Sequence, residues 1–109
     1  MKYQFRGYDE NEEKWVCGYL IADNVILSGA AAHLVDEKSV SISTGYKDYC
    51  GCTIFINDII KNTEGKTFKI EQSKGELIGV SLKDNHRYNL FSLLRISSAV
   101  KVIAIDYKK

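Results

Sequence analysis

Strict alternation of apolar and polar residues, with a period of two, is the feature that most constrains how this chain can fold. In KTFKIE, Phe68 and Ile70 share one face, and LIGVSL (77–82) repeats the pattern. A period of two is typical of half-buried β-strands, and the connection QSKGE (72–76) contains the glycine that a tight turn favours. Residues 66–82 are therefore predicted to form a β-hairpin.

Three further segments are predicted to be strands from their apolar, β-branched and aromatic content. They are EKWVCGYLI (13–21), VSIST (40–44) and VKVIAIDY (100–107). KYQF (2–5) would pair with the first of these segments across a polar turn. The last segment is apolar on both faces at its centre, which predicts a central position in a sheet.

Two segments lack a clear period of two. SGAAAHLV (28–35) is small and without alternation, so it is predicted to be a loop or one helical turn. NLFSLLRIS (89–97) fits either a short amphipathic helix, with Asn89 as its cap, or a buried strand.

Composition favours one small globular domain. The 109 residues are 45% hydrophobic and 27% charged, which is enough for one core and too apolar for disorder. We find no repeat and no linker, and we predict a single domain over residues 1–109. The predicted fold is all-β or mostly β: a small barrel-like or strongly bent antiparallel sheet with one short helix near 89–97.

The charge balance limits the classes of partner. A net charge of +1 creates no strong field toward nucleic acid or an acidic membrane. The N-terminus lacks the apolar run of a signal peptide, and no segment approaches the ~20 apolar residues of a membrane span. We therefore expect a cytoplasmic protein with no membrane association, whose three cysteines are reduced.

The most patterned stretch is TGYKDYCGCTIFINDII (44–60), which combines glycines, aspartates and cysteines. Asp48 and Gly51 occupy the first and fourth positions of a type I turn, and the Asp48 carboxylate can accept a nearby backbone N–H. Gly45 tolerates positive φ, and Asn57-Asp58 is predicted to form a second turn because Asn readily adopts left-handed φ/ψ. The stretch is predicted to be scaffold.

The same residues carry a resemblance to a known family. The pattern T-G-x-K-D-x-x-G-x-x-I-[YF]-x-x-D-I-[VI], together with FRGYDENEEKWVCGYL (5–20), resembles the YopX family of small proteins encoded by bacteriophages and prophages. Asn57 stands where that family usually has glycine, and Cys50 and Cys52 are not part of its pattern. The resemblance implies a YopX-like, compact, mostly β, barrel-like domain of phage origin, and it implies no reaction.

The C-x-C of Cys50-Gly51-Cys52 is a candidate zinc site that Cys17, His33 or His86 could complete. A strong zinc signal would need two C-x-x-C pairs or a cysteine pair with a spaced histidine pair. The interpretation favoured by the sequence is buried or half-exposed thiols in a turn, so no metal and no cofactor are predicted.

Candidate binding residues lie in two parts of the chain. Arg6 could bind a phosphate or a partner carboxylate, but an internal pair with Asp48 or Asp58 is favoured. An acid–base couple of these two aspartates would lack a nucleophile, so no catalytic residue is predicted. Tyrosine anchors protein interfaces well, and the predicted binding residues are Arg6, Trp15, Tyr46, Lys47 and Tyr49.

Two functions from different classes are compatible with these observations. The first, which near-neutral charge and seven tyrosines favour, is a non-catalytic module that binds a host or phage protein. An inhibitor of a bacterial defence system, of the anti-CRISPR or anti-restriction type, is one such module. The alternative is a small β-barrel that binds nucleic acid in phage replication or regulation. An exposed edge strand could also pair two copies of the chain.

Overall fold

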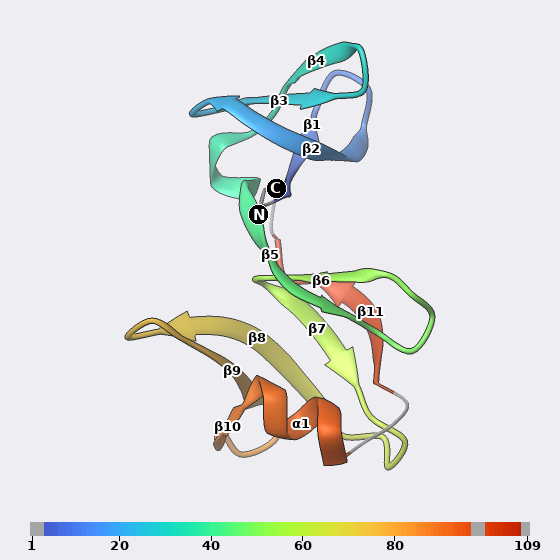
Figure 1. Ribbon diagram of the computed structural model, residues 1–109, viewed down its shortest axis with the longest axis vertical. Coiled ribbons are helices and arrows are strands. Elements are labelled where there is room, and N and C mark those ends of the chain that lie inside the picture. Colours follow the sequence, from blue (N-terminus) through green and yellow to red (C-terminus); the bar gives the residue numbers. More distant parts are fainter. Residues whose placement is uncertain (1–3, 97–99, 108–109) are drawn as a thin grey trace. The chain divides into compact units, whose positions relative to one another are not determined.

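A computed structural model describes residues 4–96 and 100–107, and the chain divides into two compact units. Unit 1 comprises residues 1–43 and unit 2 comprises residues 44–109. The fold is mostly β, with two antiparallel sheets and one short α-helix (Figure 1). Among the described residues neither sheet closes into a barrel. Of the two forms predicted for the all-β fold, the structure therefore has open antiparallel sheets and not a closed barrel. The single domain over residues 1–109 stays a prediction.

Unit 1 is an antiparallel sheet in the order β4-β3-β2-β1-β5. A 3₁₀ turn, η1 (Glu37–Ser39), precedes the last of these strands. Val16, Ile26 and Val35 are buried and form the core of the unit, with Phe5, Leu20 and Val40 packed around them. The strands are β1 (Phe5–Asp9), β2 (Lys14–Ala22), β3 (Val25–Ser28), β4 (Ala31–Leu34) and β5 (Ser41–Lys47), whose second half belongs to unit 2.

Two of the predicted strands in unit 1 are confirmed and one segment is corrected. The strand predicted at 13–21 is β2, and the one at 40–44 lies within β5 apart from its first residue. The partner of β2 is β1, which begins at Phe5, whereas residues 2 and 3 of KYQF lie outside the described residues. Of the loop or helical turn expected over 28–35, a turn is present at residues 29 and 30, but residues 31–34 are strand, because pairing with β3 holds β4 in an extended conformation despite the low β-propensity of alanine.

Unit 2 contains a second antiparallel sheet in the order β10-β9-β8-β7-β11, and β6 pairs with β5. Its core consists of Ile54, Ile60, Phe68, Ile70, Leu90 and Val100. The elements are β6 (Thr53–Phe55), β7 (Asp58–Lys61), β8 (Thr67–Ser73), β9 (Glu76–Ser81), β10 (Arg87–Asn89), α1 (Leu90–Ile96) and β11 (Lys101–Ile105).

The hairpin and the helix predicted in unit 2 are confirmed. Strands β8 and β9 pair from Phe68–Ser81 to Ser73–Glu76 around Lys74 and Gly75, which both have positive φ, as a type I′ hairpin turn requires. Helix α1 is capped by Asn89, whose Oδ1 accepts a hydrogen bond from the Ser92 N–H at 3.2 Å. Residue 97 of the predicted segment lies outside the described residues. No helix in the described ranges is long and apolar enough to cross a membrane.

The prediction that the last strand is central is wrong. Strand β11 pairs with β7 at one end of the sheet order. A bulge between Val102 and Ala104 interrupts its alternation, so that Ile103 and Ala104 are both exposed while Val102 packs on the core. The apolar residues on both faces therefore result from the bulge and not from burial on both sides.

Asp48 closes the turn that begins at its own position. The Gly51 N–H donates to the Asp48 carbonyl at 3.0 Å, as in a type I turn. The Asp48 Oδ1 accepts the N–H groups of Cys50 and Cys52 at 2.9 and 2.8 Å. Its Oδ2 accepts the Val102 N–H at 3.0 Å. One carboxylate thus satisfies three backbone donors and joins the turn to β11.

Asp58 has the equivalent role at the next turn. It is fully buried, and its Oδ2 accepts the Phe55 N–H at 2.8 Å. Asn57 has a φ of 75° and donates its N–H to the Ile70 carbonyl at 2.8 Å. Gly45, within β5, has a φ of 83°, a conformation that costs glycine little. The polar residues of this stretch make turns and hold strands.

Replacement of Asp48 by alanine is predicted to destabilise unit 2. Three backbone N–H groups lose a charged acceptor in a buried place, so we expect the free energy of unfolding to fall by about 2–4 kcal/mol. Urea denaturation followed by circular dichroism measures this change. The control is Asp84→Ala, which removes a carboxylate that bonds the His86 N–H and the Ser81 side chain in an exposed turn. Equal losses for the two variants would contradict the role given to Asp48.

Candidate functional site

Arg6 and Trp15, two of the predicted binding residues, lie together in unit 1. The Arg6 guanidinium carbon is 5.1 Å from the centroid of the Trp15 ring, a cation–π contact. The ring of Tyr8, paired with Trp15 in the β1–β2 register, meets it edge-on at 5.4 Å. Arg6 is buried, so its guanidinium is part of the packing of β1 on β2. The predicted ion pair of Arg6 with Asp48 or Asp58 stays a prediction.

The other three predicted binding residues lie in unit 2. Tyr46 is half-buried and packs against the core of that unit. Lys47 is exposed at the end of β5, and Tyr49 is 73% exposed in the turn that follows. The Tyr49 backbone N–H donates to the Val100 carbonyl at 2.8 Å, which fixes the turn under the exposed ring. Lys47 and Tyr49 are therefore available to a partner, and Tyr46 is largely committed to the core.

An apolar sheet face in unit 1 was not singled out by the sequence analysis. The registers pair Tyr19 with Leu27, Leu27 with Ala32, and Val25 with Leu34, so their side chains point to one side of the sheet. The core residues Val16 and Ile26 point to the other side. We call this side the outer face; the registers place Tyr19, Val25, Leu27, Ala32 and Leu34 on it, and the exposed Ile21 adjoins it at the register shift of β2.

The outer face is exposed although none of its side chains is charged. Tyr19, Ile21 and Leu34 are 48%, 58% and 57% exposed. Isolated exposed apolar side chains are ordinary, but a contiguous group across three paired strands is typical of an interaction surface. This face is the largest group of exposed apolar residues that the registers of unit 1 bring together.

Strand β4 borders the outer face and is the terminal strand in the sheet order. The Val35 N–H donates to the Asn24 carbonyl at 2.8 Å, which makes these two residues a hydrogen-bonded pair. In an antiparallel ladder such pairs alternate, so the N–H and C=O groups of Ala32 and Leu34 point away from β3. β4 contains no proline, lysine or acidic residue, the usual protection of an edge against further pairing.

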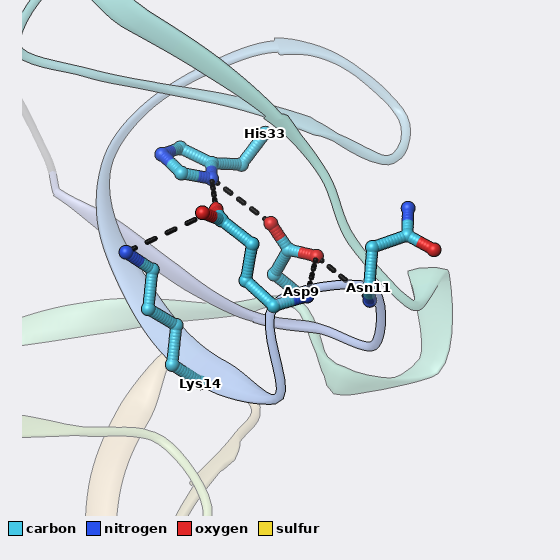
Figure 2. Close-up of polar contacts among 5 residues, drawn as sticks. Asp9, Asn11, Lys14 and His33 are labelled. Carbon is cyan, nitrogen blue, oxygen red and sulfur yellow. Dashed lines mark hydrogen bonds and ion pairs between the residues drawn. The ribbon is translucent and has the colours of Figure 1, made fainter.

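A polar cluster joins the other side of β4 to the turn between β1 and β2. His33 Nδ1 lies 2.9 Å from Asp9 Oδ2 and 3.0 Å from Glu12 Oε2. The second oxygen of Asp9, Oδ1, accepts the N–H groups of Asn11 and Glu12 at 2.9 and 3.1 Å. Figure 2 shows the Asp9 carboxylate between the turn and the ring of His33. The cluster holds β4 against the β1–β2 turn.

The burial of the cluster changes from one residue to the next. Asp9 is buried and the His33 side chain is nearly so, whereas half of the Glu12 side chain is exposed. The hydrogen bond from His33, followed by that from the Glu12 backbone, lowers the pKa of Asp9 below its ordinary value of 3.8. Asp9 is therefore an anion at neutral pH. Lys14 Nζ lies 3.9 Å from Glu12 Oε2 on the solvent side.

The three cysteines are exposed thiols, and Cys50 and Cys52 lie in the turn that begins at Asp48. The tight turn at Asp48 carries Cys50 and Cys52 to the surface. Within residues 4–96 and 100–107, the group of His, Cys, Asp and Glu side chains close enough to share a metal ion is Asp9, Glu12 and His33. No cysteine belongs to that group.

No protein-family model matches the chain, and no curated protein matches it. The resemblance to the YopX family therefore stays a prediction.

Gly18→Ala is predicted to separate β3 from β2 and so to disrupt the outer face. A Cβ at Gly18 would lie 2.0 Å from the Leu27 carbonyl oxygen, a clash with backbone that no side-chain movement relieves. We expect a loss of about 2 kcal/mol or more in unfolding free energy. The fluorescence of Trp15, the one tryptophan of the chain, reports the unfolding of unit 1.

The control is Gly29→Ala in the turn between β3 and β4. Nothing lies within 4 Å of a Cβ at that position, but its φ is +62°. The free energy of unfolding of Gly29→Ala should therefore fall by only about 1 kcal/mol, the cost of alanine in a left-handed backbone conformation. A loss at Gly18 no larger than this would show that β3 does not approach β2 closely.

Proposed function

We propose that the protein is a non-catalytic protein-binding module whose partner occupies the outer face and the open edge of β4. The observation that carries this proposal is the half-exposure of Tyr19 and Leu34 on one uncharged sheet face, with the exposed Ile21 at the adjoining register shift of β2. Burial of such side chains against a partner is favourable by about 25 cal/mol for each Å² of apolar surface removed from water. An exposed tyrosine, here Tyr19, is a frequent anchor of protein interfaces.

The geometry favours an extended segment of the partner over a helix or a loop. The outward N–H and C=O groups of Ala32 and Leu34 can pair with a strand laid along β4. Such strand addition takes affinity from backbone hydrogen bonds and specificity from alternate side chains. A partner strand with apolar residues at every second position would extend the outer face beyond Leu34.

The identity of the partner class rests on the family resemblance. The resemblance to YopX proteins suggests a phage-encoded protein in the bacterial cytoplasm that binds a host or phage protein. A component of a bacterial defence system is the partner that a small, non-catalytic phage protein would inhibit. The apolar outer face is compatible with such a target because it recognises a protein surface rather than a charge pattern.

The alternative of nucleic-acid binding has less support. Lysines would have to line a continuous groove to neutralise phosphates. In the described residues Lys14, Lys66 and Lys69 instead lie against Glu12, Glu64 and Asp106. The ion pair with Asp106, at 2.8 Å, also raises the pKa of Lys69. Each of these three lysines is therefore paired with a carboxylate of its own unit.

A library of displayed short peptides tests the proposal with the purified full-length protein. We expect selected sequences to share apolar residues at alternate positions. Leu34→Lys should weaken their binding at least about tenfold, because it places a charge on the outer face and removes an apolar contact. Ile103→Lys is the matched control, since Ile103 is a similarly exposed apolar residue on the edge strand β11 of unit 2.

Three results would contradict the proposal. One is a selection without a shared alternating pattern, and another is equal loss of binding in the two variants. The third is tight binding of single- or double-stranded nucleic acid at physiological salt that Leu34→Lys leaves unchanged. That result would support the nucleic-acid alternative.

A further inference from the structure

We propose that Asp9, Glu12 and His33 form a binding site for a divalent transition-metal ion, with Zn²⁺ as the best match. The three residues come from the end of β1, the β1–β2 turn and β4. They present one imidazole nitrogen and two carboxylate oxygens, all within 4.8 Å of one another. This inference does not depend on the proposed function, because it concerns the side of β4 opposite the outer face.

The positions of the ligand atoms are close to those of a zinc site. His33 Nδ1 is 2.9 Å from one carboxylate oxygen and 3.0 Å from the other. Around a tetrahedral Zn²⁺ with bonds of about 2.1 Å, ligand atoms stand roughly 3.4 Å apart. These two distances would therefore open by a few tenths of an ångström, and the distance between the two carboxylate oxygens, at most 4.8 Å, would adjust with them. Glu12 can provide this movement because half of its side chain is exposed.

The net negative charge of the cluster favours the binding of a cation. Two carboxylates converge on a single ring nitrogen, which carries at most one hydrogen. The three side chains sum to −2 with neutral histidine and to −1 with the imidazolium. The nearby Lys14 is exposed and 3.9 Å from Glu12 alone, so water screens its effect. A divalent ion would neutralise the cluster and would satisfy Nδ1 and both oxygens together.

The surrounding contacts orient the proposed ligands. Asp9 Oδ1 is fixed by the backbone N–H groups of Asn11 and Glu12, which leaves Oδ2 directed at the site. Hydrogen bonds of this kind to a ligating carboxylate are typical outer-shell contacts of metal sites. His33 is positioned by its pairing with Ile26, a core residue. Mixed imidazole and carboxylate donors suit Zn²⁺, and a solvent molecule would complete the tetrahedron on the open side.

A bound ion would fasten β4 to the β1–β2 turn. The sequence distance between Asp9 and His33 is 24 residues, so the ion would close a long loop of unit 1. Since a preformed site does not exist in the unfolded chain, the binding free energy would add to the stability of the unit.

The test is calorimetric titration of the metal-free, full-length protein with Zn²⁺. The exposed thiols of Cys50 and Cys52 are competing ligands, so the titration is made in a Cys50→Ser/Cys52→Ser background as well. We expect one equivalent to bind in both backgrounds. His33→Asn should weaken it at least about 100-fold, more than the loss of an outer-shell contact. Zn²⁺ should also raise the midpoint of Trp15-monitored unfolding in the parent and not in His33→Asn.

Glu12→Gln is the second variant, because its exposed side chain can change without disturbing the fold. It should weaken Zn²⁺ binding at least about tenfold even if His33→Asn fails to fold. The proposal is overturned if no equivalent binds, or if the equivalent is lost in the serine background. It is also overturned if binding persists undiminished in Glu12→Gln, which would leave Asp9 and His33 as an ordinary ion pair.

Discussion

The carboxylate of Asp9 makes the contacts on which the organisation of unit 1 depends. One of its oxygens holds the β1–β2 turn through the backbone of Asn11 and Glu12, and the other holds His33 of β4. Strand β4 has a sheet neighbour on one side only, so this side-chain contact supplies the support that a second neighbouring strand would give. Asp48 and Asp58 have comparable roles in unit 2, where each satisfies backbone N–H groups at a turn. Carboxylates at turns thus replace the rigidity that proline, absent from this chain, gives to other loops.

The two faces of β4 lead to different chemistry because successive side chains point to opposite sides of a strand. His33 faces the Asp9 cluster, and its neighbour Leu34 lies on the outer face. A metal ion at His33 would reduce the freedom of the strand whose edge we propose as the binding surface. Ordering a strand before it binds lowers the entropy lost in the complex and so increases affinity.

The parts of the fold that depend on local chemistry could be predicted from the sequence. Alternation identifies the hairpin of β8 and β9, and the Asn89 cap identifies α1. Longer-range pairing could not be predicted. β4 is rich in alanine and becomes a strand only through its register with β3, and β11 appeared central because a bulge disturbs its alternation. The candidate sites also depend on longer-range pairing. His33 and Asp9 are 24 residues apart in the sequence and meet only in the folded sheet. Tyr19 and Leu34 share a face only once three strands are paired. The apolar run Tyr19-Leu20-Ile21 was the available signal for the outer face.

Amide hydrogen exchange measured by NMR can show whether the edge of β4 is open and receives a partner strand. In the free protein the register predicts slow exchange at Ala31 and His33, which donate to β3, and fast exchange at Ala32 and Leu34. Addition of a selected peptide should slow exchange at Ala32 and Leu34 and leave residues 44–96 unchanged. Protection that appears in unit 2 while Ala32 and Leu34 continue to exchange rapidly would show that the partner does not bind at the edge of β4.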